Sequence, residues 1–469
     1  MKKHLFHIIL GLALCLLTPP ARAGGDLPPL VIPETAGMQL RGNYSDDATL
    51  DKFVAIGVKN VRMGFHWEGI EKEKGVYDFS KLDEIMARVR AHGLRMTGCL
   101  AFNNKLYGKV YESEDGRQGF AAYAAACAAH FKSDKVMWEI WNEPNTFTFW
   151  GRHGKASNSE PFAEEYLSLV KATVPAMRKA DPNCTILGGS TSNLWSASYA
   201  WCNFCFEKGM LKTGIDAWSI HPYGVHTPEG YVPAYGVVRD MMAKYGAPNF
   251  PILDTERGFG TSAKAEGFAG GAASQQRVYQ SWNLVRQYLI EFSMGIRLTS
   301  WYEWQNEKEG FGICQPDGSL YPAGVAYQVV ITQLYGCKFI KRLPTQNPLD
   351  YVMLFSGNGD KIVAWTTPPL PDPELNKTDK GRSNPDRAVP HAITVPVTGA
   401  GPMKLVQIDG TQTTVSPAGG QVSLNLTGGP QYLTVKEGTP RPPVQKTVNG
   451  HRVVSAPRGR GVCPDVCSR

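Results

Sequence analysis

VMWEIWNEPN, at residues 136–145, joins an apolar run to an abruptly polar end. Its first six residues suit a buried β-strand, whereas Asn142, Glu143, Pro144 and Asn145 do not. Pro144 ends the backbone ladder because proline has no N–H to donate. In a barrel of parallel strands, the carboxyl ends of the strands carry the functional side chains. The stretch therefore predicts a barrel strand that ends by presenting Glu143 at the mouth of a cleft.

A second acid is placed in the same way in PILDTERGFG, residues 251–260. A short apolar run there ends in Glu256, which is followed by Arg257 and glycines. Because parallel barrel strands end on one face, Glu143 and Glu256 can share one cleft.

Between residues 37 and 335, apolar runs of the β type alternate with amphipathic helical patterns, which predicts parallel strands joined by crossover helices. The predicted strands are 38–42, 58–64, 94–101, 136–143, 184–189, 215–222, 251–256 and 296–303. The predicted helices are 46–55, 80–92, 118–131, 161–180, 197–209, 234–245, 273–292 and 322–334. Eight strands in alternation with eight helices predict a (β/α)8 TIM barrel.

The chain changes character after residue 335. Residues 336–437 contain short alternating strands separated by turn residues, which predicts a C-terminal antiparallel β-sandwich. Residues 438–469 are rich in proline, arginine and glycine and have little to bury, so we expect a disordered basic tail.

The chain starts with the features of a secretory signal. Two lysines precede the apolar run Leu5–Leu17, and Ala21-Arg22-Ala23 offers a cleavage site after Ala23. The run has 13 residues, which is short for a membrane span. We therefore expect residues 1–23 to be removed, with an uncleaved anchor as the alternative, and the mature chain to be secreted or periplasmic.

The net charge of +7 is concentrated at the two ends. Residues 1–23 carry +3, residues 438–469 carry +5, and residues 24–437 sum to −1. A nearly neutral body gives no indication of a nucleic-acid partner. The basic tail is compatible with an acidic polymer as partner or with solvated disorder.

Nine of the ten cysteines lie outside the signal segment, so an oxidising compartment would leave at least one thiol unpaired. Cys202 with Cys205, and Cys463 with Cys467, are close enough in sequence for pairing. The histidines near these cysteines do not have zinc-site spacing, and no metal site or cofactor is predicted.

The stretches that end in Glu143 and Glu256 resemble the clan A retaining glycoside hydrolases. That clan carries an Asn-Glu pair after barrel strand four and a second Glu after strand seven. Within it, WEIWNEPN looks most like family 39, with families 5 and 51 next. The resemblance implies that Glu143 is the acid/base and Glu256 the nucleophile of a retaining reaction. Family 39 members also carry a sandwich after the barrel, often completed by residues before strand one, so residues 24–36 can join it.

The resemblance extends to residues around the two acids. Arg62, in VKNVRMGFHW, would hydrogen-bond Glu256 and lower its pKa. Asn142 would donate to the sugar 2-hydroxyl, and Tyr223 of the SIHPYG stretch would lie against Glu256. His221 is the first member of the same His-x-Tyr pair.

Aromatic residues are further candidates for substrate binding. Trp301, in TSWYEWQNE, would form the floor under the sugar, because an apolar ring face suits the C–H side of a pyranose. Trp67 and either Asn103 or Asn104 are weaker candidates. The stretch after Asn145 carries Phe147, Phe149 and Trp150, which suit sugar platforms or simply fasten a loop to the barrel.

Each assignment has a structural alternative. Arg62 could belong to a barrel ion pair, and His221 and Tyr223 could be core residues. Glu139 is expected to be a buried structural acid, yet it competes with Glu143 for the acid role. The other available carboxylates are Asp254, Glu303 and Glu307.

These features predict a retaining glycoside hydrolase that cleaves a poly- or oligosaccharide through a covalent glycosyl-enzyme intermediate. The aromatic loop favours an endo-acting enzyme on an extracellular polysaccharide. An exo-acting, xylosidase-like β-glycosidase and a transglycosylase would use the same residues. A non-catalytic polysaccharide-binding protein is the alternative of another class, although loss of catalysis commonly removes one carboxylate and both are present here.

Overall fold

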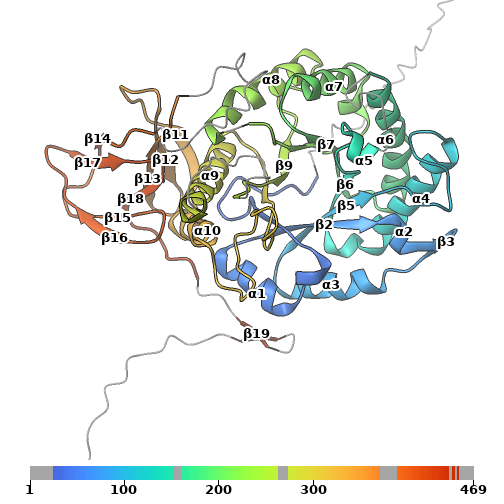
Figure 1. Ribbon diagram of the computed structural model, residues 1–469, viewed down its shortest axis with the longest axis horizontal. Helices are drawn as coiled ribbons and strands as arrows, with labels where there is room; N and C mark the ends of the chain where they lie inside the picture. The colour runs from blue at the N-terminus through green and yellow to red at the C-terminus, as the bar shows by residue number, and fades with distance from the viewer. Residues whose placement is uncertain are drawn as a thin grey trace, which may run out of the picture.

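The computed structural model describes residues 25–150, 160–225, 227–261, 273–369 and 388–442, together with the backbone of 446–448 and 451–453. Figure 1 shows a barrel surrounded by helices and a smaller β-sheet unit beside α9 and α10. The predicted signal segment and Cys463 and Cys467 lie outside the described residues.

Eight parallel strands close into a barrel, which confirms the predicted (β/α)8 fold. Each strand overlaps its predicted range. In order around the ring they are β1 (Ala36–Gln39), β10 (Thr299–Trp301), β9 (Ile252–Arg257), β8 (Ala217–His221), β7 (Thr185–Ser192), β6 (Met137–Ile140), β5 (Arg95–Ala101) and β2 (Asn60–His66).

The helices form an outer layer around the strands (Figure 1). The long ones all overlap the predicted ranges: α1 (Asp47–Ile56), α3 (Ser80–Ala91), α4 (Glu114–His130), α6 (Glu160–Ala180), α7 (Ser196–Glu207), α8 (Tyr231–Lys244), α9 (Ala273–Ser293) and α10 (Pro322–Gln333). Two short helices, α2 (Trp67–Ile70) and α5 (Phe147–Trp150), follow strands β2 and β6. Among the described residues, no helix is long and apolar enough to cross a membrane.

Residues 25–35 close the amino-terminal end of the barrel, and the backbone of Ile32 also hydrogen-bonds to Gly336 and Cys337, at the start of the predicted sandwich range. Leu27 packs on the apolar residues at the base of five strands: Met137, Leu187, Ala217, Leu253 and Leu298. The backbone N–H groups of Gly25 and Asp26 donate to Asp216 Oδ1 and Thr185 Oγ1 at 3.2 and 3.0 Å. Leu27 thereby covers the apolar side chains at the base of the barrel, and the two hydrogen bonds hold the segment in place.

An antiparallel β-unit follows the barrel, as the strand pattern predicted. Its six-stranded sheet has the order β11 (Lys338–Arg342), β12 (Asp350–Ser356), β13 (Asp360–Thr366), β18 (Gln431–Lys436), β15 (Met403–Val406) and β16 (Gln412–Val415). A second sheet pairs β14 (His391–Pro396) with β17 (Gln421–Leu426). Alternate residues of β17 are buried, which gives this unit a separate apolar core between its two sheets.

A buried ion pair joins the barrel to the sandwich. Arg286 of α9 donates to Glu229 Oε1 at 2.7 Å, and Trp365 Nε1 of β13 donates to the same oxygen at 2.8 Å. Thr367 Oγ1 donates to the other oxygen of Glu229 at 3.2 Å. Burial alone would raise the pKa of Glu229, but Arg286 and these hydrogen bonds lower it. The carboxylate is therefore held charged inside the interface.

Replacing Glu229 with alanine should destabilise the chain by about 3–5 kcal/mol, because Arg286 would keep a buried charge without its partner. Urea unfolding measures the change. Glu84→Ala is the control, since the exposed pair of Glu84 with Arg88 should contribute less than about 1 kcal/mol. Equal stabilities of the two variants would show that the buried network does not hold the domains together.

The first residues of the predicted disordered tail are ordered. Arg441 Nη1 donates to the carbonyl of Ala55 at 3.0 Å, in the last turn of α1, and Asn358 Oδ1 accepts from the N–H of Thr439 at 2.7 Å. The reason is that the final carbonyls of a helix lack partners and an arginine satisfies them. Farther on, β19 (Lys446–Val448) pairs with β20 (His451–Val453), and residues 454–469 lie outside the described residues.

Cys202 and Cys205, which are close enough in sequence to pair, are both free, buried thiols on α7. Every cysteine among the described residues is likewise free and buried: Cys99, Cys127, Cys184, Cys202, Cys205, Cys314 and Cys337. Burial raises the pKa of each of these thiols. Since the thiolate is the reactive form of cysteine, the raised pKa makes these thiols less reactive.

Candidate active site

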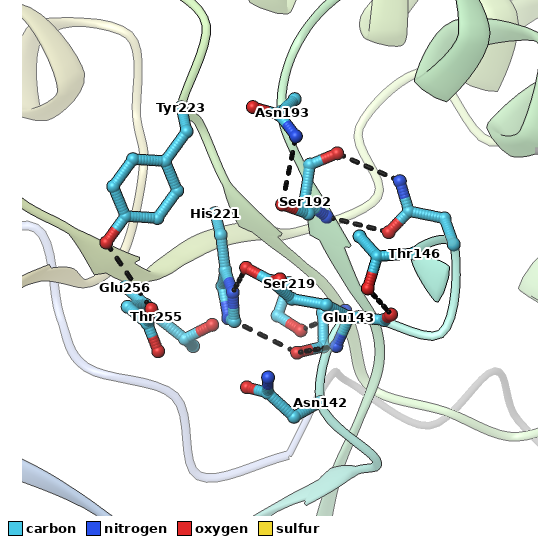
Figure 2. Close-up of polar contacts among 12 residues, drawn as sticks. Asn142, Glu143, Thr146, Ser192, Asn193, Ser219, His221, Tyr223, Thr255 and Glu256 are labelled. Atoms are coloured by element: carbon cyan, nitrogen blue, oxygen red, sulfur yellow. Dashed lines mark hydrogen bonds and ion pairs between the residues drawn. The ribbon is translucent and has the colours of Figure 1, made fainter. Parts of the chain in front are cut away.

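The backbone bends sharply where β6 delivers Glu143. The strand ends at Ile140, three residues before the predicted end, because Trp141 and Glu143 have positive φ angles of 69° and 47°. Such angles are unfavourable for side chains with a Cβ and cost about 1–3 kcal/mol each. The N–H and hydroxyl of Thr146 both donate to the Glu143 carbonyl at 3.0 Å and hold the turn. The bend directs the Glu143 carboxylate over the carboxyl end of the barrel (Figure 2).

The two predicted acids meet at this end of the barrel. A carboxylate oxygen of Glu143, a carboxylate oxygen of Glu256 and a ring nitrogen of His221 all lie within 4.8 Å of one another. The Glu143 side chain is 10% exposed and the Glu256 side chain 16%, so both reach solvent. The structure thus brings together acids that are 113 positions apart in the sequence.

Arg62 lies at the centre of the polar network beneath the acids. Its Nη1 donates to Glu256 Oε2 at 2.8 Å, its Nη2 to Asn142 Oδ1 at 2.8 Å and its Nε to Glu139 Oε2 at 2.8 Å. Tyr223 donates its hydroxyl to the other oxygen of Glu256 at 3.3 Å. Arg62 therefore forms a barrel ion pair and also orients Glu256, so its two predicted roles coexist.

Glu139 is the structural acid that the sequence predicts. Its side chain is fully buried, and Thr255 Oγ1 donates to its Oε1 at 2.6 Å. Burial favours the neutral acid, but the charge of Arg62, the nearby His221 ring and the hydrogen bond from Thr255 lower the pKa of Glu139. An inaccessible carboxylate that stays charged cannot protonate a leaving group, so Glu139 does not compete with Glu143.

His221 connects the acids from below. Its Nδ1 is 2.9 Å from Glu143 Oε1, and its Nε2 is 3.2 Å from Ser190 Oγ and 3.9 Å from Glu139 Oε1. Burial alone would lower the pKa of His221, but the charge of Glu256, the nearby Glu139 carboxylate and the hydrogen bond to Glu143 raise it to about 9. At neutral pH the ring is therefore an imidazolium that donates to Glu143.

Replacing Glu256 with glutamine should lower the pKa of His221, because the Glu256 charge is the main influence that raises it. Histidine ring NMR across pH measures the change, and His391 of β14, far from the barrel mouth, is the internal control. An unchanged His221 pKa in the variant would contradict the electrostatic coupling.

The same pKa predicts how stability depends on pH. A histidine titrates near 6.5 in the unfolded chain and His221 near 9 in the folded chain. Its stabilising contribution is complete below pH 6.5 and is lost as the pH rises through about 9. The Glu256→Gln variant should lose less stability than the wild-type chain between pH 6.5 and about 9.

The other carboxylates weighed as catalytic candidates are occupied elsewhere. Asp254 is fully buried, its Oδ2 accepts from Gln287 at 2.8 Å, and burial raises its pKa. Glu303 accepts from Arg41 and from the hydroxyl of Tyr44. Glu307 is exposed and accepts from the hydroxyl of Tyr321 at 2.9 Å. Glu143 and Glu256 remain as the facing pair.

The two tryptophans that were predicted to contact the substrate, Trp67 and Trp301, lie in different environments. Trp67 is fully buried and stacks between Tyr107 and Tyr123, with ring centroids 5.0 and 5.6 Å away. It belongs to the core and does not reach the cleft, because the chain turns into α2 at this residue. Trp301 stands at the end of β10, is 2% exposed and donates Nε1 to the Phe311 carbonyl at 3.4 Å.

Asn103 and Asn104, the weaker candidates after β5, are both engaged within the chain. The Asn103 Oδ1 accepts from the N–H of Val110 at 3.0 Å. The buried Asn104 donates to the Glu71 carbonyl at 2.7 Å. These contacts shape the loop after β5.

Ser190 is a residue of the site that was not predicted from the sequence. Ser190 follows the same rule as Glu143, since it belongs to a polar run at the carboxyl end of β7. Its hydroxyl accepts from the N–H of Glu143 at 3.3 Å.

Glu143, His221 and Glu256 could also be considered as metal ligands. However, the ring nitrogens of His221 lie 2.9 Å from Glu143 Oε1 and 3.2 Å from Ser190 Oγ, so both already have hydrogen-bond partners within the chain. Arg62 already places a positive charge 2.8 Å from Glu256. The arrangement therefore suits proton transfer and attack by a carboxylate better than metal binding.

Solved structures share this fold. A family 39 glycoside hydrolase from the gut symbiont Bacteroides cellulosilyticus WH2 superposes with a TM-score of 0.68 at 21% identity, covering 87% of this chain and 81% of that one. The similarity supports the architecture of barrel plus sandwich.

Two curated relatives match over shorter stretches. The chain is 25% identical over 140 residues to "Beta-xylosidase" of Geobacillus stearothermophilus, covering 26% of this chain and 25% of the relative. It is also 25% identical over 140 residues to "Endo-1,4-beta-xylanase A" of Humicola insolens, covering 29% of this chain and 36% of the relative. The match thus spans well under half the length of either relative.

The family model "Cellulase (glycosyl hydrolase family 5)" matches residues 30–307, which is more than half of the chain and includes both acids. The predicted resemblance to clan A is thereby confirmed. The chain belongs to the cellulase family of glycosyl hydrolases, family 5, and is a clan A glycoside hydrolase.

Proposed function

We propose that the chain cleaves glycosidic bonds with retention, with Glu256 as nucleophile and Glu143 as acid/base. The observation that carries this proposal is the separation of at most 4.8 Å between oxygens of the two carboxylates. Retaining enzymes hold their carboxyl groups about 5–5.5 Å apart, whereas inverting enzymes leave about 6.5–9.5 Å for a water molecule.

In the first step, a Glu256 oxygen forms a bond to the anomeric carbon while the glycosidic C–O bond breaks. Glu143 gives its proton to the departing oxygen. In the second step, Glu143 takes a proton from water, the water oxygen bonds to the anomeric carbon, and Glu256 leaves as a carboxylate.

The surrounding residues support these steps. Arg62 and Tyr223 donate to the two oxygens of Glu256, which fixes the orientation of the attacking carboxylate. Asn142 is oriented by Arg62 so that its amide can donate to the sugar 2-hydroxyl. His221 donates to Glu143 and fixes the carboxyl group beside the departing oxygen.

We propose a β-linked polysaccharide as the substrate, with a xylan as the first to test. The names of the two curated relatives, a beta-xylosidase and an endo-1,4-beta-xylanase, support this class. Endo action is supported by the aromatic residues beside the cleft. The signal-like residues 1–23 support action outside the cytoplasm.

A panel of xylan, xylo-oligosaccharides, cello-oligosaccharides and manno-oligosaccharides tests the proposal, with the anomer of the first product followed by ¹H NMR. We expect internal cleavage and a β-anomer as the first product of a β-linked substrate. Release of single sugars from one end would support the exo-acting alternative, and longer products would indicate transglycosylation. An α-anomer as first product would rule out retention.

A further inference from the structure

Two aromatic side chains are exposed after the neighbouring strands β6 and β7. Among the phenylalanine and tryptophan side chains that the structure describes, only Phe147 and Trp195 expose more than 40% of their surface, at 44% and 50%. Phe147 follows β6 and Trp195 follows β7, and these strands are neighbours in the barrel. Both rings therefore lie at the end of the barrel that carries the acids. Large apolar surface left in water at such a place commonly marks a binding site.

The two aromatic positions are held in a fixed relation by Asn145. Its Nδ2 donates to the Ser192 carbonyl at 2.9 Å and to Ser198 Oγ at 3.2 Å, and its Oδ1 accepts from the N–H of Ser192 at 2.9 Å. These bonds attach the loop of Phe147 to the first turn of α7, which Trp195 precedes. A rigid aromatic surface loses little conformational entropy when a ligand binds.

Trp195 is also directly connected to the catalytic cleft. The indole edge lies against Gly224, where an added Cβ would be 3.5 Å from Cε3 of Trp195. Gly224 follows Tyr223, whose hydroxyl donates to Glu256. The N–H of Leu194 donates to the Tyr223 carbonyl at 3.0 Å. Figure 2 shows Asn193, two residues before Trp195, in the upper part of the view together with Tyr223.

The order of strands around the barrel indicates which sugar Trp195 can contact. Trp195 and Tyr223 follow β7 and β8, in the short arc between Glu143 on β6 and Glu256 on β9. Arg62 lies on β2 and Trp301 on β10, in the opposite, longer arc.

A glycone placed over the longer arc leaves the short arc for the leaving group. Figure 2 shows Asn142, which would contact the 2-hydroxyl, and Asn193 on opposite sides of Glu143 in that view. The sugar that departs with the proton from Glu143 therefore faces β7 and β8.

We propose that Trp195, together with Phe147, forms a leaving-group subsite that binds a pyranose ring beyond the cleaved bond. The inference rests on the proposed retaining function. It adds that efficient cleavage requires a sugar, and not only a small leaving group, on the leaving-group side of the cleaved bond. The indole face would stack on the C–H face of the pyranose. Trp195 is thus a specificity-determining residue for polymeric substrates.

Kinetics of Trp195→Ala on two substrates test the subsite. One substrate is the panel oligosaccharide that the wild-type chain cleaves fastest, xylohexaose in the first instance, and the other is the glycosyl fluoride of the same sugar. Fluoride occupies no sugar subsite when it leaves. We expect kcat/KM on the oligosaccharide to fall about tenfold or more, a loss typical of one aromatic contact, and kcat/KM on the fluoride to stay within about twofold. Phe147→Ala should act in the same direction.

Controls separate binding from folding. Trp195→Tyr should recover part of the oligosaccharide activity, because a smaller ring still stacks. Val237 is also an exposed apolar residue but lies on α8, so Val237→Ala should leave kcat/KM unchanged on both substrates. Equal losses of Trp195→Ala on both substrates would overturn the subsite and assign the residue a structural role.

The remaining outcomes are also distinguishable. Unchanged kinetics together with a smaller species in size-exclusion chromatography would overturn the subsite and assign Trp195 to a contact between copies of the chain. A wild-type chain that cleaves neither substrate would overturn the proposed function, and the subsite with it.

Discussion

Glu256→Ala should lower kcat by about 10⁴-fold or more, because it removes the group that forms the covalent bond. The side chain is only 16% exposed and is held by Arg62 and Tyr223, so no other carboxylate can take its place without rearrangement. Turnover of an aryl glycoside measures the loss.

Azide makes this experiment specific for a nucleophile. In the space left by the shortened side chain, azide can attack the anomeric carbon directly, and the product should be a glycosyl azide of inverted configuration. Glu307→Gln is the control, since this exposed acid contacts Tyr321 and should retain full activity. Failure of azide to restore turnover, with the fold intact, would count against Glu256 as nucleophile.

The second large effect is expected at Glu143. Glu143→Gln should lower kcat/KM on oligosaccharides by about 10²–10⁴-fold, the usual contribution of general acid–base catalysis. For a 2,4-dinitrophenyl glycoside, kcat/KM, which reports the first step, should fall much less. The reason is that this leaving group departs without needing a proton. The comparison is made from kcat/KM on both substrates with each variant.

Glutamine keeps the shape of the Glu143 side chain and its contact with His221, so the loss should reflect proton transfer. A circular dichroism melt checks that the variant keeps the fold and the thermal stability of the wild-type chain. Equal losses on the oligosaccharide and the dinitrophenyl glycoside would indicate that Glu143 only positions the substrate.

The barrel could be predicted from the sequence because its signals are local. Apolar β-type runs separated by amphipathic helices specify strands, and the polar ends of two runs identify Glu143 and Glu256. The contacts of Arg62 and of Tyr223 with Glu256 matched the expected neighbours. These predictions depend on strand ends meeting at one face, which the closed barrel guarantees.

The features that were not predicted depend on backbone angles and on which side a residue faces. The positive φ values of Trp141 and Glu143, which shorten β6, have no signature in side-chain polarity. Trp67 starts a helix, so its side chain turns into the core. Leu27 covers the barrel base because the strands expose apolar side chains there. Cys202 is three residues from Cys205, but the helical backbone directs both thiols into packing contacts.

Trapping with a 2-deoxy-2-fluoro glycoside that carries a good leaving group is the most direct test of the central claim. The fluorine slows the second step more than the first, so the glycosyl-enzyme accumulates. Proteolysis and mass spectrometry should then find one added glycosyl unit on the peptide that contains Glu256, and none in the Glu256→Gln variant. A label on Asp254 or another carboxylate, or release of the leaving group in turnover with no labelled peptide, would contradict the account.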